Sequence, residues 1–201
     1  MEAYVSKKNN PFSDQMALAA LGGIGKFIRP ACANASDEAA REALMLASMQ
    51  AGMAFSNSSV TMVHGMSRPL GVFFHIPHGM SNAMLVPEIT NFSYESERPR
   101  YAASCRALGL CAHDASDADA SAALPIRLAE LSAELKVPTL QEFGVTKKAF
   151  FDAVPTMAKM ALASGSPNNN PKVPTVEEVE AVYKRVWDIG EATTKKRASK
   201  L

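Results

Sequence analysis

The chain has 201 residues, of which 47% are hydrophobic and 20% are charged, proportions typical of one globular domain with a substantial core. Its 21 basic and 20 acidic residues leave a net charge of +1, so no long-range field favours nucleic acid or a membrane surface. Charged residues or histidine interrupt each apolar stretch before it reaches the length of a membrane span. The three cysteines lack Cys-x-x-Cys spacing and are interpreted as reduced thiols.

The first sixty residues predict two long helices. Ser13 is the expected N-cap of the first, which should end near Pro30, and Ser36 is the expected N-cap of the second. The run at residues 22–25, Gly-Gly-Ile-Gly, lacks the preceding strand and the third glycine of a dinucleotide fingerprint, so it favours close helix packing. A stripe of mostly small residues at helical spacing points to the same contact: Ala40, Leu44, Ala47, Ala51 and Ala54.

The second half of the chain also reads as helical. Residues 96–108 predict a helix with its arginines on a solvated face, and residues 118–135 predict a helix interrupted at Pro125. Thr146 is the expected N-cap of a helix kinked at Pro155. Residues 175–178, Thr-Val-Glu-Glu, form a capping box that starts the last helix.

No strong alternating pattern, internal repeat or domain linker is present in the sequence. The prediction is therefore an all-α fold with a single multi-helix domain at residues 1–190. After Trp187 the apolar pattern fades, and residues 191–201 are predicted to be a basic, flexible tail.

Residues 63–89 contain three of the four histidines in an otherwise apolar run. His64 and His78 are 14 positions apart, which is about 21 Å along one straight helix, whereas two ligands of one metal each lie only about 2.1 Å from it. Sharing a metal therefore requires the chain to reverse. Helix breakers that supply a reversal lie between or beside them: Pro69, Gly71, Pro77 and Gly79. The alternative is a pair of hydrogen-bonded core histidines, and the spacing alone leaves both open.

Two further clusters carry weaker signals. Ser81 and Asn82 follow His78 by about one helical turn, where they either orient groups at the site or cap the helix. The run at residues 111–114, Cys-Ala-His-Asp, has no further ligand at zinc-type spacing, so a separate metal site there is not favoured.

The segment HGMSRPLGVFFHIPHGMSNAMLVPEI resembles the signature of the iron-containing (group III) alcohol dehydrogenases, and the resemblance continues through NPFSDQMAL and SPNNNPKVPT. It implies the helical C-terminal domain of the dehydroquinate synthase-like fold. It also implies that His64 and His78 are two of four side chains holding one divalent metal, either Fe²⁺ or another such as Zn²⁺. The implied reaction is NAD(P)-dependent oxidation of a small alcohol, or reduction of an aldehyde or ketone.

The sequence departs from the family pattern at two places. Many members carry a second histidine four residues after the first, and here that position is Arg68, whose guanidinium stays charged and cannot relay protons as a neutral base. Arg68 is therefore only a tentative catalytic residue, with an anion-binding or positioning role. The family motif Asp-Ala-x-x-His-Ala-x-Glu-Ala-Tyr ends here as Met1-Glu2-Ala3-Tyr4, so the other two metal ligands and the nucleotide-binding half are expected to lie upstream of Met1.

Two hypotheses follow. One is an alcohol dehydrogenase of which this chain is an incomplete half, inactive by itself, acting on a small alcohol or aldehyde. The other is a non-catalytic helical module that forms a homo-oligomer or pairs with a nucleotide-binding half. In either case residues facing the absent part should be under-covered: Val60, Val63, Phe73 and Phe74, with the small stripe Ala47, Ala51 and Ala54.

The chain ends in Ser199-Lys200-Leu201, which matches the receptor-read peroxisomal address. We expect peroxisomal targeting if the source is eukaryotic and a cytoplasmic location otherwise.

Overall fold

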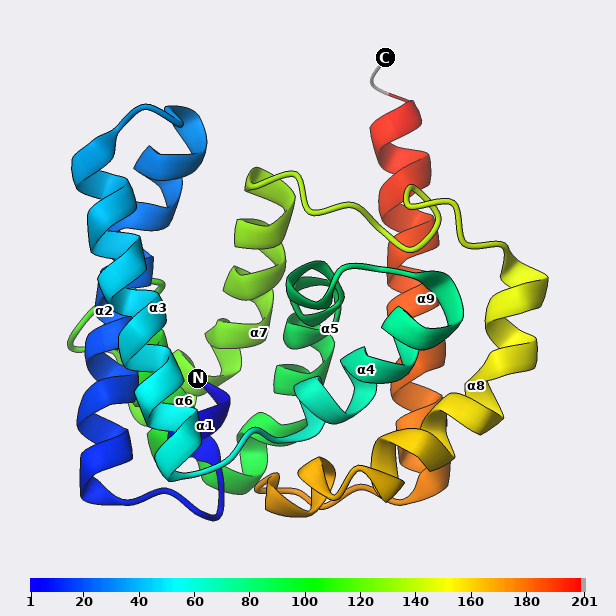
Figure 1. The fold of residues 1–201 in the computed structure, drawn as a ribbon, viewed down its shortest axis with the longest axis horizontal. Coiled ribbons are helices and arrows are strands. Elements are labelled where there is room, and N and C mark those ends of the chain that lie inside the picture. Colours follow the sequence, from blue (N-terminus) through cyan, green and yellow to red (C-terminus); the bar gives the residue numbers. More distant parts are fainter. Residues whose placement is uncertain (200–201) are drawn as a thin grey trace.

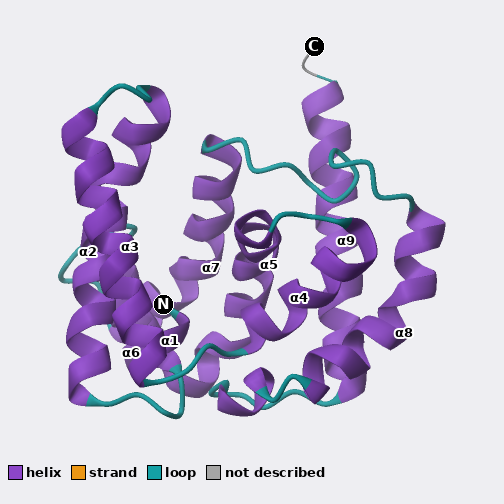
Figure 2. Ribbon diagram, in the orientation of Figure 1, coloured by secondary structure: helices purple, strands orange, loops and turns teal. Residues whose placement is uncertain are grey.

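In a computed structural model of the chain, residues 1–199 are described, and every regular element among them is helical (Figures 1 and 2). This confirms the all-α prediction. In chain order the elements are α1 (Glu2–Val5), α2 (Pro11–Ala33), α3 (Glu38–Asn57), α4 (Met62–Phe74), α5 (His78–Ser93), the 3-10 turn η1 (Tyr94–Glu97), α6 (Arg98–Ala107), α7 (Asp117–Glu134), α8 (Lys147–Ala163), the 3-10 turn η2 (Ser166–Asn169) and α9 (Val176–Ala198).

Helices α2 and α3 form a long antiparallel hairpin at one side of the molecule (Figure 1). Small residues allow their close approach, because a Cβ atom added at Gly23 would lie 3.0 Å from the Cβ of Ala47. A Cβ added at Gly25 would lie 2.3 Å from the carbonyl oxygen of Leu108, just after α6. The glycine run therefore serves helix packing, as predicted. Three members of the predicted stripe are buried: Ala40, Ala47 and Ala54.

Helix α5 lies between two hydrophobic cores, since Val86 packs against both. The first core joins α4, α5, α8 and α9, and in it the rings of Phe150 and Trp187 stack with their centroids 5.0 Å apart. The Tyr183 hydroxyl donates a 2.6 Å hydrogen bond to the carbonyl of Met66 and so ties α9 to α4. The second core joins α1, α2, α6 and α7. Helix α5, which begins at His78, therefore packs against both cores.

Two helix starts differ from the predicted ones. Asn10, not Ser13, caps α2, and its side chain accepts a 3.0 Å hydrogen bond from the Ser13 N–H. Asp37, not Ser36, caps α3 by accepting a 2.9 Å bond from the N–H of Ala40. Asn, Asp and Ser are nearly equivalent as N-caps. The local sequence therefore does not decide which of the neighbouring candidates caps the helix, and tertiary packing does.

Prolines do not end the helices where the sequence suggested. Helix α2 continues through Pro30 to Ala33, and α4 continues through the buried Pro69. An internal proline removes one backbone hydrogen bond, and at Pro69 packing in the core offsets that cost, whereas Pro30 is exposed and lies three residues before α2 ends. The reversal after α4 falls instead at His75, which adopts the left-handed conformation with φ 55°, and Pro77 then precedes α5.

Arg100 does not lie on a solvated face as predicted. Its Nε donates a 2.6 Å hydrogen bond to the carbonyl of Tyr4, and its guanidinium lies 4.0 Å from the centroid of the Tyr4 ring. It also pairs with Asp14. Arg100 therefore joins α6 to α1 and α2, and so helps hold α1 in place.

Helix α9 runs to Ala198, so residues 191–198 form helix where a flexible tail was predicted. Arg197 anchors this end through a 2.6 Å contact from its Nη1 to the carboxylate of Glu142. Lys200 and Leu201 lie outside the described residues, and the peroxisomal address that they complete stays a prediction.

Helix α2 is long and apolar enough, by length and composition, to cross a membrane. This differs from the expectation that charged residues interrupt every candidate, because Lys26 and Arg29 fall near one end of the helix. In the structure Ala17, Ala20 and Leu21 of α2 are buried against the rest of the domain.

The predicted under-covered surface is only partly correct. Val63 is 4% exposed, because α4 turns it inward. Phe73 is 39% exposed, as expected. The largest apolar exposure lies instead on the outer face of α3, opposite its buried stripe, where four side chains are 44–73% exposed: Met45, Leu46, Met49 and Met53.

Candidate metal and active site

The reversal between α4 and α5 brings His64 and His78 together. His64 lies in the first turn of α4, and His78 is the first residue of α5. Their ring centroids are 5.0 Å apart with an interplanar angle of 62°. The predicted convergence of the two imidazoles from different helices is therefore confirmed, and their role as metal ligands stays a prediction. His75 caps the end of α4 and is exposed.

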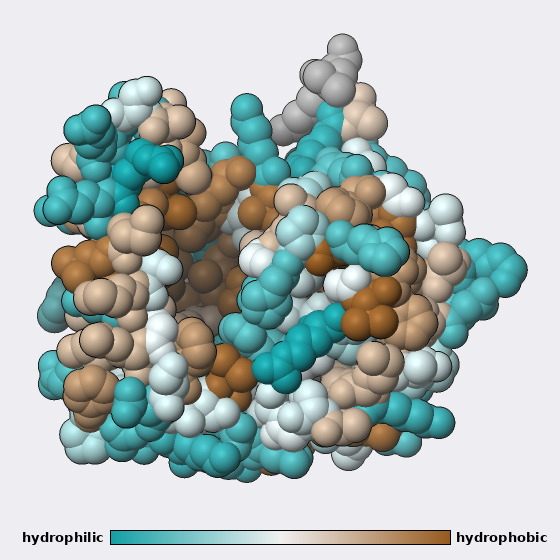
Figure 3. Space-filling view, in the orientation of Figure 1, coloured by the Kyte–Doolittle hydropathy of each residue, from teal (hydrophilic) through white to brown (hydrophobic). Residues whose placement is uncertain are grey.

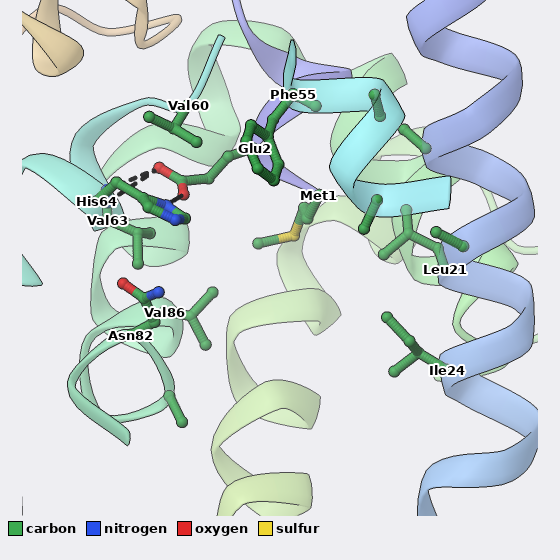
Figure 4. Close-up of a pocket in the computed structure, with 16 residues that line it drawn as sticks. Met1, Glu2, Leu21, Ile24, Phe55, Val60, Val63, His64, Asn82 and Val86 are labelled. Atoms are coloured by element: carbon green, nitrogen blue, oxygen red, sulfur yellow. Dashed lines mark hydrogen bonds and ion pairs between the residues drawn. The ribbon is translucent and has the colours of Figure 1, made fainter. Parts of the chain in front are cut away.

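Glu2 of α1 is the partner of His64. One carboxylate oxygen of Glu2 contacts the Nδ1 atom of His64 (Figure 4). The other oxygen, Oε1, accepts hydrogen bonds from the N–H of Thr61 at 2.9 Å, the hydroxyl of Thr61 at 2.7 Å and the N–H of Val63 at 2.9 Å. The side chain of Glu2 is only 12% exposed. One carboxylate thus positions both the imidazole and the helix that carries it.

This arrangement also explains how α4 begins. No side chain of its own caps α4, and its first turn contains no acidic residue. The first N–H groups of a helix need acceptors and favour a nearby negative charge. Glu2 supplies both from α1. Burial raises the pKa of the Glu2 carboxyl, but the hydrogen bonds from His64 and Thr61 and the charge on His64 together outweigh burial and leave the pKa below its usual value.

His78 is oriented from within its own helix. The Asn82 Nδ2 atom lies 3.2 Å from the Nε2 atom of His78, so the amide holds the ring from one turn along the helix. Ser81 donates a 2.9 Å hydrogen bond to the carbonyl of His78, which is not a cap, and no side chain caps the start of α5. Desolvation lowers the pKa of His78, and positive charge at His64 and Arg68 lowers it further. A neutral imidazole is the form that binds a metal.

Arg68 lies one turn after His64 on the same face of α4. Its Nη1 atom makes a long 3.4 Å hydrogen bond to the hydroxyl of Ser166 in η2. η2 is held close to α4 at Gly65, where an added Cβ would lie 2.7 Å from Pro167. The Asn-rich loop that resembled the family sequence therefore forms the wall beside Arg68.

A pocket of about 280 Å³ opens beside His64. Its lining is mostly apolar and comes from α1 to α5, with Leu21 and Ile24 across from His64 and with Met1 and Phe55 between them (Figure 4). Figure 3 shows a recess lined by hydrophobic residues between the α2–α3 hairpin and the central helices. An apolar pocket with a few convergent polar groups suits a small organic ligand.

The residues present fit part of a metal site. Glu2 occupies Nδ1 of His64 and leaves Nε2 as the atom that could bind a metal, which is the carboxylate–histidine arrangement typical of metal-binding histidines. The Oδ1 atom of Asn82 is buried without a hydrogen-bond partner, which suits a donor arriving at this place. Among the described residues no group of three or more His, Cys, Asp or Glu side chains could hold a metal ion. His64 and His78 could supply two ligands, and a metal site here would need others.

Sequence reasoning missed Glu2. It lies 62 positions before His64, and no periodicity or spacing connects the two. The available signal was the family motif itself, in which a glutamate stands at this position.

The structure is a helical domain in which two histidines converge at the junction of two helices, beside an apolar pocket. The profile of the Fe-containing alcohol dehydrogenase family, C-terminal, matches residues 1–187, and the chain belongs to this family.

Sequence and structure relatives agree with this assignment. The chain is 33% identical over 188 residues to the 1,3-propanediol dehydrogenase of Citrobacter freundii and 35% identical over 185 residues to alcohol dehydrogenase 4 of Schizosaccharomyces pombe. These matches cover 93% and 92% of this chain but 48% and 42% of the relatives. The structure matches 1,3-propanediol oxidoreductase with a TM-score of 0.86 and 32% identity, over 92% of this chain and 48% of that one. The chain thus spans about half the length of these relatives.

We expect replacement of Glu2 to weaken both the fold and the orientation of His64. Glu2→Gln keeps the shape but presents an amide to Nδ1 of His64, so the free energy of unfolding should fall by about 1–3 kcal/mol. Urea denaturation at pH 7 measures this change, and ¹⁵N NMR of the imidazole should show a changed tautomer. The matched control is Glu95→Gln, which removes an exposed pair with Arg98 and should change stability little. Equal unfolding energies for the two variants would contradict the role given to Glu2.

Proposed function

We propose that this chain is the metal-binding helical half of an NAD(P)-dependent alcohol dehydrogenase that interconverts small alcohols and their aldehydes or ketones. The observation that carries the proposal is the convergence of His64 and His78 at 5.0 Å, with Glu2 holding the first of them. The names of relatives support the reaction class, since they include 1,3-propanediol dehydrogenase, NADPH-dependent butanol dehydrogenase and lactaldehyde reductase.

Different residues of the site are suited to different roles. Nε2 of His64 and the imidazole of His78 would hold a divalent metal, Fe²⁺ or Zn²⁺, together with ligands from outside the described residues. When bound, such an ion supplies Lewis-acid polarisation of the substrate oxygen. Glu2 fixes the tautomer of His64, and the apolar pocket excludes water and receives the hydrocarbon part of the substrate. NAD(P) would accept or give the hydride.

The proposal is tested by adding the ligands and the nucleotide-binding half from a relative. We expect the 201-residue chain alone to show no NAD(P)-dependent alcohol oxidation, because two histidines do not complete a metal site. A fusion to the first half of the Citrobacter freundii 1,3-propanediol dehydrogenase should gain metal-dependent activity with 1,3-propanediol.

Each of His64→Ala and His78→Ala should lower the activity of the fusion by about a hundredfold or more. His113→Ala, which removes an exposed histidine in the α6–α7 loop, is the control and should leave activity unchanged. Activity of the isolated chain that disappears in His78→Ala would contradict the prediction and would mean that copies complete the site for one another. Activity of the fusion that survives both site variants would overturn the proposal.

A second candidate function is a non-catalytic module that associates with a partner or with itself. The outer face of α3 favours it, since Met45 is 73% exposed and Met49 is 53% exposed, and contiguous apolar surface promotes association. We expect the isolated chain to self-associate at tens of micromolar in light scattering, and a Met45→Lys/Met49→Lys variant to shift toward monomer. A monodisperse wild-type monomer with a cooperative thermal transition would contradict this expectation.

We further propose peroxisomal targeting if the source is eukaryotic, on the basis of Ser199-Lys200-Leu201 alone. A fluorescent fusion that keeps a diffuse distribution both with and without these three residues would exclude it.

A further inference from the structure

Two thiols meet where α6 ends. Cys105 lies in the last turn of α6 and is buried, and Cys111 lies in the loop that follows and is half-buried. The side chain of Cys111 packs against the second core, which contains Cys105, and the two thiols are within hydrogen-bonding reach of each other. Neither residue lines the pocket beside His64, so the site described above does not use this pair.

The backbone makes the pairing a fixed feature of the fold. The N–H of Gly109 donates a 2.9 Å hydrogen bond to the carbonyl of Arg106, and the N–H of Leu110 donates a 3.0 Å hydrogen bond to the carbonyl of Cys105. With Gly109 at φ 64°, these two bonds form a Schellman ending, in which the chain folds back over the last turn of its own helix. Cys111 is the next residue, so its backbone lies beside the turn that holds Cys105.

Arg106 closes the loop from its far end. Its Nη2 atom donates 2.7 Å hydrogen bonds to the carbonyl of Ala115 and to the carboxylate of Asp117, the first residue of α7. The charge of its guanidinium acts on both sulfur atoms. Burial and the neighbouring thiol of Cys111 raise the pKa of Cys105 to about 12, so Cys105 is a protonated thiol at neutral pH. The two sulfurs therefore differ in burial and in reactivity.

We propose that Cys105 and Cys111 form a reversible disulfide when the protein meets hydrogen peroxide. The thiolate is the form of cysteine that attacks a peroxide, and Cys111 is the one of the pair that solvent reaches. Its sulfur bonds to one peroxide oxygen, the O–O bond breaks, and the departing hydroxide is protonated to water, which leaves a sulfenic acid on Cys111.

The second step uses the buried thiol. The sulfur of Cys105 attacks the sulfur of the sulfenic acid, the S–S bond forms, the S–O bond breaks, and the departing hydroxide takes the thiol proton of Cys105. The pair has then lost two electrons and two protons, and one hydrogen peroxide has become two waters. A small dithiol reverses the bond by thiol–disulfide exchange.

The disulfide fastens a contact between helices. Leu108 lies between the two cysteines, and a Cβ added at Gly25 of α2 would lie 2.3 Å from its carbonyl oxygen. A cross-link across Leu108 therefore fixes the end of α6 on which α2 packs. The bonded sulfurs must be about 2.05 Å apart, and the exposed residues 112–114 let the loop make that adjustment. This inference rests on the two thiols and does not depend on the proposed dehydrogenase activity.

Peptide mapping of the oxidised 201-residue chain tests the proposal. The reduced protein is treated with limiting hydrogen peroxide, the remaining thiols are blocked with iodoacetamide, and the chain is digested with trypsin, which cleaves after Arg106 and so separates the two cysteines. We expect peptides 101–106 and 107–127 to be linked as the main product, lighter by two hydrogens than the free pair, and to separate after treatment with dithiothreitol. A main product that links Cys32 to either cysteine, or that joins two chains, would overturn the proposal.

Cysteine variants assign the two steps. Cys105→Ser should stop the reaction after the first step and leave a sulfenic acid on Cys111 that dimedone traps. Cys111→Ser should slow the oxidation of Cys105 by about tenfold or more, because the accessible thiol is gone. The matched control is Cys32→Ser, which removes an exposed cysteine of α2 and should leave the linked peptides unchanged. Oxidation of Cys105 at the same rate in Cys111→Ser would contradict the mechanism.

The contribution of the fold is measured separately, because the two cysteines are close in sequence. The equilibrium between the dithiol and the disulfide is titrated with reduced and oxidised glutathione, once in native protein and once in denaturing urea. The constant for the Cys105–Cys111 disulfide should be about tenfold or more larger in the native protein, where the two thiols are already in contact. Equal constants would show that the fold does not position the pair and would overturn the inference, whatever the fused enzyme does.

Discussion

The carboxylate of Glu2 is the interaction on which the site depends. It joins α1 to α4 by accepting from the backbone at Thr61 and Val63 while it holds Nδ1 of His64. A buried carboxylate is costly unless its oxygens are satisfied, and here the unfilled donors at the start of α4 satisfy it. The same hydrogen bonds give the first N–H groups of α4 an acceptor and give the buried carboxylate its donors. The same contact fixes the orientation of the His64 imidazole.

The second histidine is fixed by packing. Helix α5 lies between the two hydrophobic cores and is therefore held along its length. His78 is the first residue of α5, so its backbone is held in place with the helix. Asn82, one turn further along, orients the imidazole ring. The sharp reversal at His75 then sets the distance between the two helix starts. A site built on helix termini in this way needs little local sequence beyond the histidines themselves.

The electrostatics of the site are uneven. The hydrogen bonds and charge of its partners outweigh burial and lower the pKa of the Glu2 carboxyl, desolvation and neighbouring positive charge lower the pKa of His78, and Arg68 makes one long hydrogen bond to Ser166. Polar groups thus line one edge of the site, while the pocket beneath it is apolar. This separation suits a ligand with a hydrocarbon body and polar ends.

The sequence by itself determined the all-α class, most helix positions, the packing role of the glycine run and the pairing of His64 with His78. Those features follow from local periodicity, capping chemistry and a motif contained within 27 residues. The tertiary structure alone decided that Glu2 supports His64, that Arg100 is tied to α1 and that residues 191–198 are helical. It also decided which prolines remain inside helices. Each of these outcomes depends on contacts between residues far apart in the chain, or on burial that offsets a local cost, and neither leaves a periodic signal in the sequence.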